Sequence, residues 1–391
     1  MTEYRDWQRV SVNAAGNRYL VATKPGVFSH GHDDPSSTML VEHAIVEPGG
    51  VVVHLNCGNG LFGAAAALGH ASRVFLTDRN VVNVEAARRT LIANDAGRAE
   101  VILGHGSTSL PQDLSANTIG IRIPKEKGAV RQLLWDAFAL LSAGGRCYMA
   151  GATNEGIKSA ASLMTEVFGH AHAIAHDSGH RILFAKKQSE SPPSLNAADI
   201  RLVDHDAFNE VQATLRGEPT TLFSRPGVFS WEHLDEATSI LSDAIAVAPG
   251  ESVLDLGCGA GALGIVAARL SGTGMITMLD ADVEAVRSAT RSAQAANVTN
   301  YRVLPSDIAE AVLNERFDVV VTNPPFHVGK ATALDVPLQF IRDAWQVLAP
   351  GGRLFLVANR TLPYERTIYQ RFGNIETVVD GRRFKVLSAT K

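Results

Sequence analysis

The sequence predicts two copies of an α/β domain, each a doubly wound sheet with helices on both faces. One observation is a repeat: the hexapeptide KPGVFS at residues 24–29 recurs as RPGVFS at 225–230, within a chain of 391 residues. The other is a pattern of short apolar runs, each followed by a helical stretch, which is typical of parallel strands buried on both faces. At about 150 residues per domain, the length also favours more than one domain.

The repeat extends well beyond the hexapeptide. At the same offset of 201 positions, VVVHLNCGNG (51–60) aligns with SVLDLGCGAG (252–261). Further along, SAGGRCYMAG (142–151) aligns with APGGRLFLVAN (349–359). Because several separate blocks match in the same order, the chain is a duplicated domain.

Composition marks the boundary between the copies. A stretch rich in Ser, Pro and Asn interrupts the apolar pattern, which is typical of a linker. We therefore expect a first domain at 1–187, a linker at 188–197 and a second domain at 198–391.

Charge and cysteine content exclude several classes of protein. Hydrophobic residues make up 46% and charged residues 19%, which is ordinary globular usage, and the net charge of −4 excludes a generally cationic surface. The three cysteines cannot form a disulfide framework, and none lies in a pair with metal spacing. No run approaches the ~18 apolar residues that a membrane span needs. We expect a cytoplasmic protein with no membrane segment and no metal.

The elements of the second copy follow from the apolar pattern in chain order. The expected strands are residues 252–257, 275–280, 301–305, 317–323 and 352–359. The expected helices are residues 261–270, 283–297 and 337–348. This alternation predicts a parallel sheet, with ligands at the carboxyl ends of its strands.

The run DLGCGAG at the end of the first of these strands is the first candidate binding element. Its glycines Gly257, Gly259 and Gly261 let the backbone approach a ligand, although such a turn also serves simple helix–strand packing. Asp255 precedes the glycines and their spacing is GxGxG, which differs from a dinucleotide fingerprint. An acid here suits a cationic ligand such as S-adenosyl-L-methionine. Asp280 closes the next strand, where it can accept from the two hydroxyls of a ribose.

The tetrapeptide NPPF at 323–326 is the candidate catalytic element. Two prolines after a buried strand fix the backbone, so the Asn323 side-chain oxygen and the Pro324 carbonyl project rigidly. If each accepts one N–H of an exocyclic amine, the nitrogen lone pair turns toward a methyl sulfonium, and Phe326 offers a face for a flipped-out base. The alternative is a strand-ending turn with a core phenylalanine.

Two further residues have open roles. Asp307, after the third strand, either accepts from an adenine amino group or caps a helix. His327 either contacts the substrate or forms part of the wall of the site, and we favour the wall.

These blocks resemble the two-domain ribosomal RNA guanine-N2 methyltransferases, whose domains are tandem Rossmann-like class I methyltransferase folds. The resemblance rests on PGVFS with Leu234-Asp235 after it, DLGCGAG, NPPFHVG, LPY at 362–364 and RFKV at 383–386. One departure is the segment Glu236-Ala237-Thr238, where the family usually has a glycine.

The resemblance implies S-adenosyl-L-methionine as cofactor and a guanine of ribosomal RNA, free or in a subunit, as acceptor. Its implied cofactor-binding residues are Asp255, Gly257, Gly259, Gly261 and Asp280, to which we add Asp307 and Asn323 from their positions after the strands. Its implied catalytic residues are Asn323, Pro324 and Phe326, and the implied substrate-binding residues of the second copy are Phe229, Phe326 and His327.

The first copy has lost these features. His54 stands where the second copy has Asp255, and RIPK at 122–125 stands where it has NPPF. We therefore expect this copy neither to bind the cofactor nor to methylate. Arg122 and Lys125, with Lys127, predict a basic edge that docks RNA, and an ordinary solvated face is the alternative.

Two other activities remain open at this point. Adenine-N6 methylation uses the same Asn-Pro geometry. A non-catalytic RNA-binding or assembly protein that keeps a cofactor pocket is the alternative from a different class, and an intact NPPF argues against it.

Overall fold

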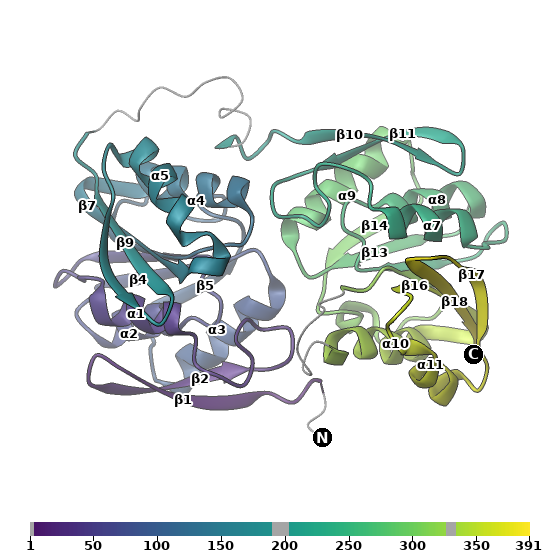
Figure 1. The fold of residues 1–391 in the computed structure, drawn as a ribbon, viewed down its shortest axis with the longest axis horizontal. Coiled ribbons are helices and arrows are strands. Elements are labelled where there is room, and N and C mark those ends of the chain that lie inside the picture. The colour runs from purple at the N-terminus through teal and green to yellow at the C-terminus, as the bar shows by residue number, and fades with distance from the viewer. Residues whose placement is uncertain (1–3, 190–202, 326–333) are drawn as a thin grey trace. The chain divides into compact units, whose positions relative to one another are not determined.

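The computed structural model describes residues 4–189, 203–325 and 334–391 and divides the chain into two compact units, Met1–Ala207 and Phe208–Lys391 (Figure 1). Both units are α/β, so the predicted tandem fold is confirmed. Phe326, His327 and the expected linker from residue 190 onward lie outside the described residues.

The second unit is built on a seven-stranded sheet with the order β14-β13-β12-β15-β16-β18-β17. Five of these strands are parallel: β12 (Val253–Leu256), β13 (Ile276–Asp280), β14 (Tyr301–Pro305), β15 (Phe317–Thr322) and β16 (Leu348–Asn359). Each lies over a run expected to be a strand. The sheet continues through two antiparallel strands, β17 (Glu376–Asp380) and β18 (Phe384–Thr390).

Helices cover both faces of this sheet. They are α7 (Glu236–Ala244), α8 (Ala262–Ser271), α9 (Val283–Ala295), α10 (Asp335–Val347) and α11 (Tyr364–Phe372). Val319 and Val321 pack in one hydrophobic cluster with α7, α8 and α9, while Val320 between them is also fully buried. Burial of successive residues explains why these strands read as unbroken apolar runs.

The first unit repeats this plan with the order β5-β4-β3-β6-β7-β9-β8. Its strands are β3 (Val51–Leu55), β4 (Arg73–Asp78), β5 (Ala99–Leu103), β6 (Ala116–Arg122), β7 (Leu141–Ala152), β8 (His172–Asp177) and β9 (His180–Lys186). Its helices are α1 (Pro35–His43), α2 (Leu61–Leu68), α3 (Val81–Ala93), α4 (Lys127–Leu140) and α5 (Ile157–Phe168).

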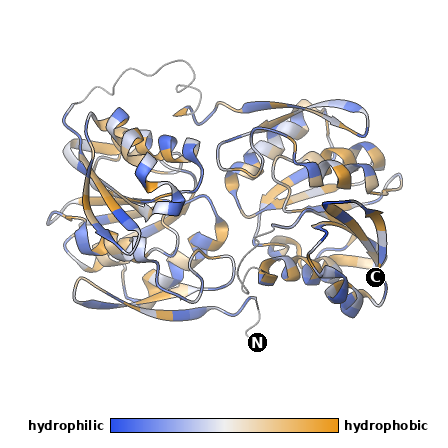
Figure 2. Cartoon of the chain, viewed as in Figure 1, coloured by the Kyte–Doolittle hydropathy of each residue, from blue (hydrophilic) through white to orange (hydrophobic). Residues whose placement is uncertain are grey.

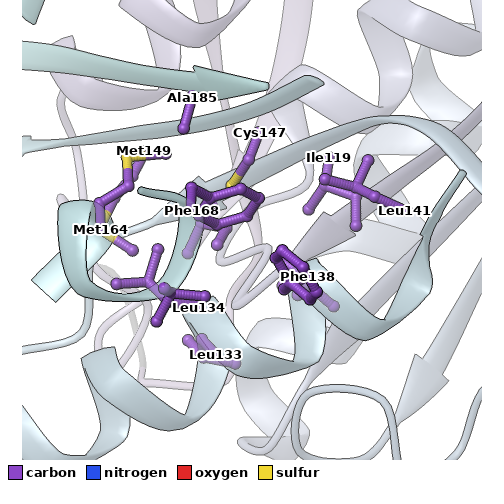
Figure 3. Close-up of a cluster of buried hydrophobic side chains, with 14 of the residues drawn as sticks. Ile119, Leu133, Leu134, Phe138, Leu141, Cys147, Met149, Met164, Phe168 and Ala185 are labelled. Atoms are coloured by element: carbon purple, nitrogen blue, oxygen red, sulfur yellow. The ribbon is translucent and has the colours of Figure 1, made fainter. Parts of the chain in front are cut away.

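The core of the first unit lies on both sides of its sheet. Phe168 of α5 lies next to Cys147 and Met149 of β7, and its ring contacts that of Phe138 of α4 with the centroids 5.4 Å apart (Figure 3). On the other face, Tyr148 of β7 packs in a second cluster with α1, α2 and α3. Apolar residues follow the inner strands and polar residues the outer sides of the helices (Figure 2).

Each unit also begins with a β-hairpin that the apolar pattern did not reveal. The hairpins are β1 (Gln8–Ala14) with β2 (Asn17–Thr23), and β10 (Asn209–Leu215) with β11 (Glu218–Ser224). The second is tied to α9, because the Phe223 N–H donates to Ser292 Oγ (2.8 Å). Their alternating polar residues reflect strands with one exposed face.

The unit boundary falls later than the expected start of the second domain at 198. His205, beyond the linker, lies 2.8 Å from Asp136 Oδ1 on α4 through its Nε2. Its ring also contacts that of His105 edge-on, with the centroids 5.8 Å apart. These contacts hold the end of the connecting segment on the first unit.

The PGVFS loop has the same conformation in both units. Ser29 and Ser230 both have left-handed backbone angles (φ 56° and 51°), and the same turn closes each loop, through Val27 N–H to Lys24 O and Val228 N–H to Arg225 O. In the second unit, Arg225 anchors the loop by an ion pair with Glu284 of α9, and both side chains are almost fully buried.

We expect Arg225→Ala to lower the free energy of unfolding of the second unit by about 3 kcal/mol, because the change leaves the buried Glu284 carboxylate without its buried partner. Urea denaturation measures this loss. Arg287→Ala is the matched control, because Arg287 pairs with the same carboxylate from a half-exposed position and should cost less than about 1 kcal/mol. Equal losses in the two variants would contradict a buried anchor.

Candidate active site

The candidate site lies at β12 of the second sheet. From this strand the chain first builds β13 and β14 on one side and then returns to build β15 and β16 on the other. β12 pairs with β13 on one side and with β15 on the other, and all three strands are parallel. Their carboxyl ends therefore open at the same edge, which is the usual ligand position in such sheets. This arrangement brings DLGCGAG, Asp280 and Asn323 to one edge.

The glycine turn is shaped by hydrogen bonds to β13. The N–H groups of Gly257 and Cys258 both donate to Leu279 O (2.9 Å), and the Gly259 N–H donates to Asp280 Oδ2 (2.9 Å). Gly259 has φ 53°, and a Cβ there would meet no atom within 4 Å, so this part of the backbone is open. Gly261 has φ 85°, and its Cβ would lie 3.1 Å from Ala289, so the close approach of α8 to α9 requires glycine.

Asp255 is fully buried beneath this turn. Its Oδ2 accepts the Gly264 N–H of α8 (2.9 Å), whereas its Oδ1 is buried and no described residue donates to it. Burial raises the pKa of Asp255 from 3.8 to about 7; the Gly264 N–H opposes this rise and the charge of Asp280 adds to it. The site thus contains a buried acceptor atom that a cationic ligand would satisfy.

Two side chains follow the next strands. Asp280 is half-buried at the end of β13, and its Oδ1 accepts the Asp282 N–H (3.0 Å). Asp307 is half-buried after β14, beside a 3₁₀ turn at Glu310–Val312. The N-cap residue of that turn is Ala309, and the Ser306 Oγ accepts the Ala311 N–H (3.1 Å). The turn therefore begins after Asp307, and a contact of Asp307 with adenine stays a prediction.

Cys258 lies within the turn and does not resemble a nucleophile. Burial raises the pKa of its thiol well above the usual value, and the charges of Asp280 and Asp255 add to the rise. The thiolate is therefore disfavoured, and Cys258 packs in the hydrophobic cluster of the second unit.

Asn323 follows β15 directly and has a fully used amide nitrogen. Its Nδ2 donates to Asp235 Oδ2 (3.0 Å) and to Thr238 Oγ1 (2.9 Å), two residues at the start of α7. Its Oδ1 is buried and has no hydrogen-bond partner among the residues that the structure describes. β15 is held in place next to β12 by a bond from Thr322 Oγ1 to Leu256 O (2.7 Å).

Sequence reasoning did not find the contacts of Asp235 and Thr238. A helix-start signal was present, because an Asp precedes the first turn of α7 and caps it by accepting the Thr238 N–H (2.9 Å). That local signal does not indicate that the start of α7 contacts Asn323, which lies 88 positions later in the chain.

The first unit keeps the shape of the glycine turn but not its chemistry. The Gly58 N–H still donates to Asp78 Oδ2 (2.9 Å), as in the second unit. His54 is fully buried in place of Asp255, and neither of its ring nitrogens has a hydrogen-bond partner in the described ranges. Burial lowers the pKa of His54 to about 3, so the ring is neutral near pH 7 and supplies no negative charge.

Arg122, which we expected in a basic docking edge, lies inside the first unit. Its side chain is 7% exposed and pairs with Asp34 (3.3 Å) and Glu155 (2.7 Å), so its charge is neutralised inside the unit. Lys125 and Lys127 are exposed. The exposed part of the expected edge is therefore reduced to these two lysines.

Arg122 also covers the phenylalanine of the first PGVFS loop. Its guanidinium carbon lies 3.8 Å from the centroid of the Phe28 ring. The corresponding Phe229 of the second unit is 63% exposed, and Asn323 there has a much shorter side chain than arginine. The first unit thus stacks a planar cation on the ring that the second unit leaves open.

Within the described part of the chain, no group of three metal-binding side chains is found. Among those residues no helix is both long and apolar enough to cross a membrane.

Known proteins are similar to this chain in both sequence and fold. The model of the methyltransferase small domain matches twice, at residues 18–184 and 219–388. A ribosomal RNA small subunit methyltransferase C from Hahella chejuensis is 32% identical over 284 residues, 72% of this chain and 80% of that protein. The protein of the same name from Shewanella halifaxensis is 31% identical over 289 residues, 73% of this chain and 81% of that protein.

A solved structure agrees over almost the whole length. The T. thermophilus 16S rRNA N2 G1207 methyltransferase, in complex with AdoMet and guanosine, is 29% identical and covers 98% of each chain with a TM-score of 0.81. The resemblance seen in the sequence is confirmed. The chain belongs to the ribosomal RNA small subunit methyltransferase C family, and both of its domains are methyltransferase small domains.

Proposed function

We propose that this protein transfers the methyl group of S-adenosyl-L-methionine to the exocyclic N2 of a guanine in small-subunit ribosomal RNA, and that it acts in the cytoplasm. The observation that carries the proposal is the Asn323 amide. Its nitrogen donates to two partners, and within the described part of the chain its buried oxygen has none, at the edge where the glycine turn also lies. The AdoMet and guanosine bound to the T. thermophilus relative support the same chemistry.

The residues present fit this cofactor. The unpaired Oδ1 of Asp255 suits its ammonium group, the open backbone at Gly259 admits a ligand, and the Asp280 carboxylate suits ribose hydroxyls. We assign Asp255, Gly257, Gly259, Gly261 and Asp280 to cofactor binding, with Asp307 toward the adenine. When bound, the cofactor supplies an electrophilic methyl group on a sulfonium.

The chain's own part in the reaction is to orient the amine. The lone pair of a guanine N2 is delocalised into the ring, so the amine is a poor nucleophile. Acceptance of one N–H by Asn323 Oδ1 and of the other by the Pro324 carbonyl would pyramidalise the nitrogen and turn its lone pair toward the methyl group. Both acceptors also stabilise the positive charge that builds on nitrogen, so no strong base is required.

Phe229 is assigned to stacking of the target base. The first unit supports this assignment, because Phe28 in the same loop conformation already stacks a planar guanidinium. A flipped-out guanine is also planar, and base–aromatic stacking contributes about 1–3 kcal/mol. Phe326 and His327 stay as predictions, since they lie outside the described residues.

We assign RNA docking, not chemistry, to the first domain. Changing Lys125 and Lys127 together to Ala should weaken RNA binding and flatten its salt dependence, because each lost phosphate contact removes about 0.7–0.9 from the log–log slope. Titration of RNA at several salt concentrations measures the slope. An unchanged slope would make the two lysines ordinary solvated side chains.

Transfer of labelled methyl from the cofactor into small-subunit ribosomal RNA that lacks the modification tests the proposed activity. The wild-type chain should label the RNA, and Asn323→Ala should label it far more slowly. Cofactor binding without any label in RNA would favour the non-catalytic alternative.

A further inference from the structure

We propose that Asp235 and Thr238 are positioning residues that lock the Asn323 amide with its oxygen toward the reacting amine. The inference rests on the proposed function and deepens it. It assigns the orientation of the catalytic acceptor to the first turn of a helix that lies far from NPPF in the sequence.

The contacts use every hydrogen of the amide. One N–H of Asn323 reaches Asp235 Oδ2 at 3.0 Å and the other reaches Thr238 Oγ1 at 2.9 Å. The amide nitrogen has no donor left for the substrate, and the oxygen accepts from none of the residues in 4–189, 203–325 and 334–391. An amine needs acceptors, so this is the useful orientation.

The opposite orientation of the amide is excluded by chemistry. An asparagine side chain has nearly the same shape after a half-turn that exchanges its oxygen and nitrogen, so shape alone does not decide. An ionised Asp235 only accepts hydrogen bonds, and the Thr238 hydroxyl already donates to Asp235 Oδ2 (3.2 Å). Both partners therefore act as acceptors toward Asn323, and a turned amide would place its oxygen against two other oxygens.

The two partners are themselves held by the backbone. Asp235 is the N-cap of α7, and its Oδ2 also accepts the Thr238 N–H at 2.9 Å. The first turn of a helix is rigid, so its side chains fix the direction of the Asn323 amide. The carboxylate behind the amide also polarises it, which strengthens the amide oxygen as an acceptor for an amine that becomes cationic.

In the first unit, the aspartate that corresponds to Asp235 caps a helix but pairs with an arginine in place of an asparagine amide. Asp34 caps α1 in the same way, since its Oδ2 accepts the Ser37 N–H (3.3 Å) and hydroxyl (2.6 Å). Its further partner is the Arg122 guanidinium and not an amide. The cap is thus kept where no methyl transfer is expected, and the second unit adds the amide contacts to it.

Asp235→Asn tests the inference without removal of the cap, because asparagine caps helices as well as aspartate does. Its new N–H groups can face the Asn323 oxygen, so the amide can turn. We expect the single-turnover rate of methyl transfer to fall about tenfold or more, while the Kd for S-adenosyl-L-methionine changes by less than about twofold. Thr238→Val should slow the same step, and Thr238→Ser should restore it. Asp34→Asn is the matched control in the first unit and should keep the wild-type rate.

A reciprocal exchange gives the sharpest readout. Asp235→Asn combined with Asn323→Asp again pairs a donor with an acceptor and leaves a carboxylate oxygen for the amine, so the double variant should be faster than Asp235→Asn alone. A role in helix capping alone predicts no such rescue. The inference is overturned if Asp235→Asn transfers methyl at the wild-type rate, or if the exchange recovers nothing. A wild-type chain that leaves guanine unmethylated would instead overturn the proposed function.

Discussion

Asn323→Ala should lower the rate of methyl transfer in a single turnover by about a hundredfold or more, which corresponds to about 3 kcal/mol of transition-state stabilisation. The change removes the buried oxygen that is proposed to hold the amine while positive charge builds on its nitrogen. Cofactor affinity should stay nearly unchanged, because Asp255 and the glycine turn remain. Rapid-quench measurement with saturating RNA and cofactor separates the chemical step from binding.

Asn323→Asp on its own is a poor substitute, although it keeps an acceptor. It sets a second carboxylate against Asp235, whose Oδ2 is 3.0 Å from the Asn323 Nδ2 in the native chain. A wild-type single-turnover rate for Asn323→Ala would contradict the amine-orienting mechanism and reduce NPPF to the end of a strand.

Affinity for S-adenosyl-L-methionine should rise as the pH increases from about 5.5 to about 7.5, and Asp255→Asn should abolish this dependence. The pKa of Asp255 is about 7 in the folded chain, so its carboxylate is mostly protonated at the lower pH and ionised at the higher. The ammonium of the cofactor prefers the ionised form. Above about pH 8 the ammonium itself loses its proton, so the rise should end there.

The same titration sets the sign of the effect on stability. Because the folded pKa of Asp255 lies above the ordinary value of 3.8, the free energy of unfolding of the cofactor-free chain should fall as pH rises from about 4 to about 7, and this contribution should be constant above that.

Asp255→Asn keeps an acceptor for the Gly264 N–H but carries no charge. We expect its cofactor affinity near pH 7.5 to be about tenfold or more below wild type. Calorimetric titration at several pH values measures both the affinity and its slope, and a parallel slope in Asp255→Asn would assign the titration to another group.

The same titrations count the sites. The chain should bind one cofactor, because His54 supplies a neutral ring where the second unit supplies Asp255. Asp78, which corresponds to Asp280, is also almost fully buried and accepts from Asn83 (3.2 Å). Binding of two cofactor molecules per chain would contradict the prediction that the first copy does not bind the cofactor.

Much of the fold was predictable because burial on both faces leaves a simple signature. The five parallel strands of the second sheet all lie over apolar runs such as 317–323, and the duplication carried the same plan to the first unit. The hairpins and the antiparallel strands β17 and β18 were missed. The hairpin strands lack an unbroken apolar run because buried positions alternate with more exposed ones along them. β17 is exposed at most of its positions, and the polar residues Lys385 and Ser388 interrupt the largely buried β18.

The site was predictable where function depends on local backbone shape. Prolines fix the backbone, and glycines allow turns that other residues rarely adopt. The turn at 255–261 and the tetrapeptide could therefore be placed at strand ends. The partners of individual side chains were not predictable, because they come from distant segments. Arg122 pairs with Asp34 and Glu155, which lie in other parts of the chain, and Asp235 accepts from Asn323, 88 positions away. The local sequence indicates none of these contacts.

The identity of the methylated nucleoside tests the central claim most directly. Small ribosomal subunits or their RNA, without the native modification, would be treated with the wild-type chain and S-adenosyl-L-methionine, digested to nucleosides and resolved by chromatography and mass spectrometry. The account predicts N2-methylguanosine from the wild-type chain and almost none from Asn323→Ala. N6-methyladenosine, or no methylated nucleoside at all, would contradict it.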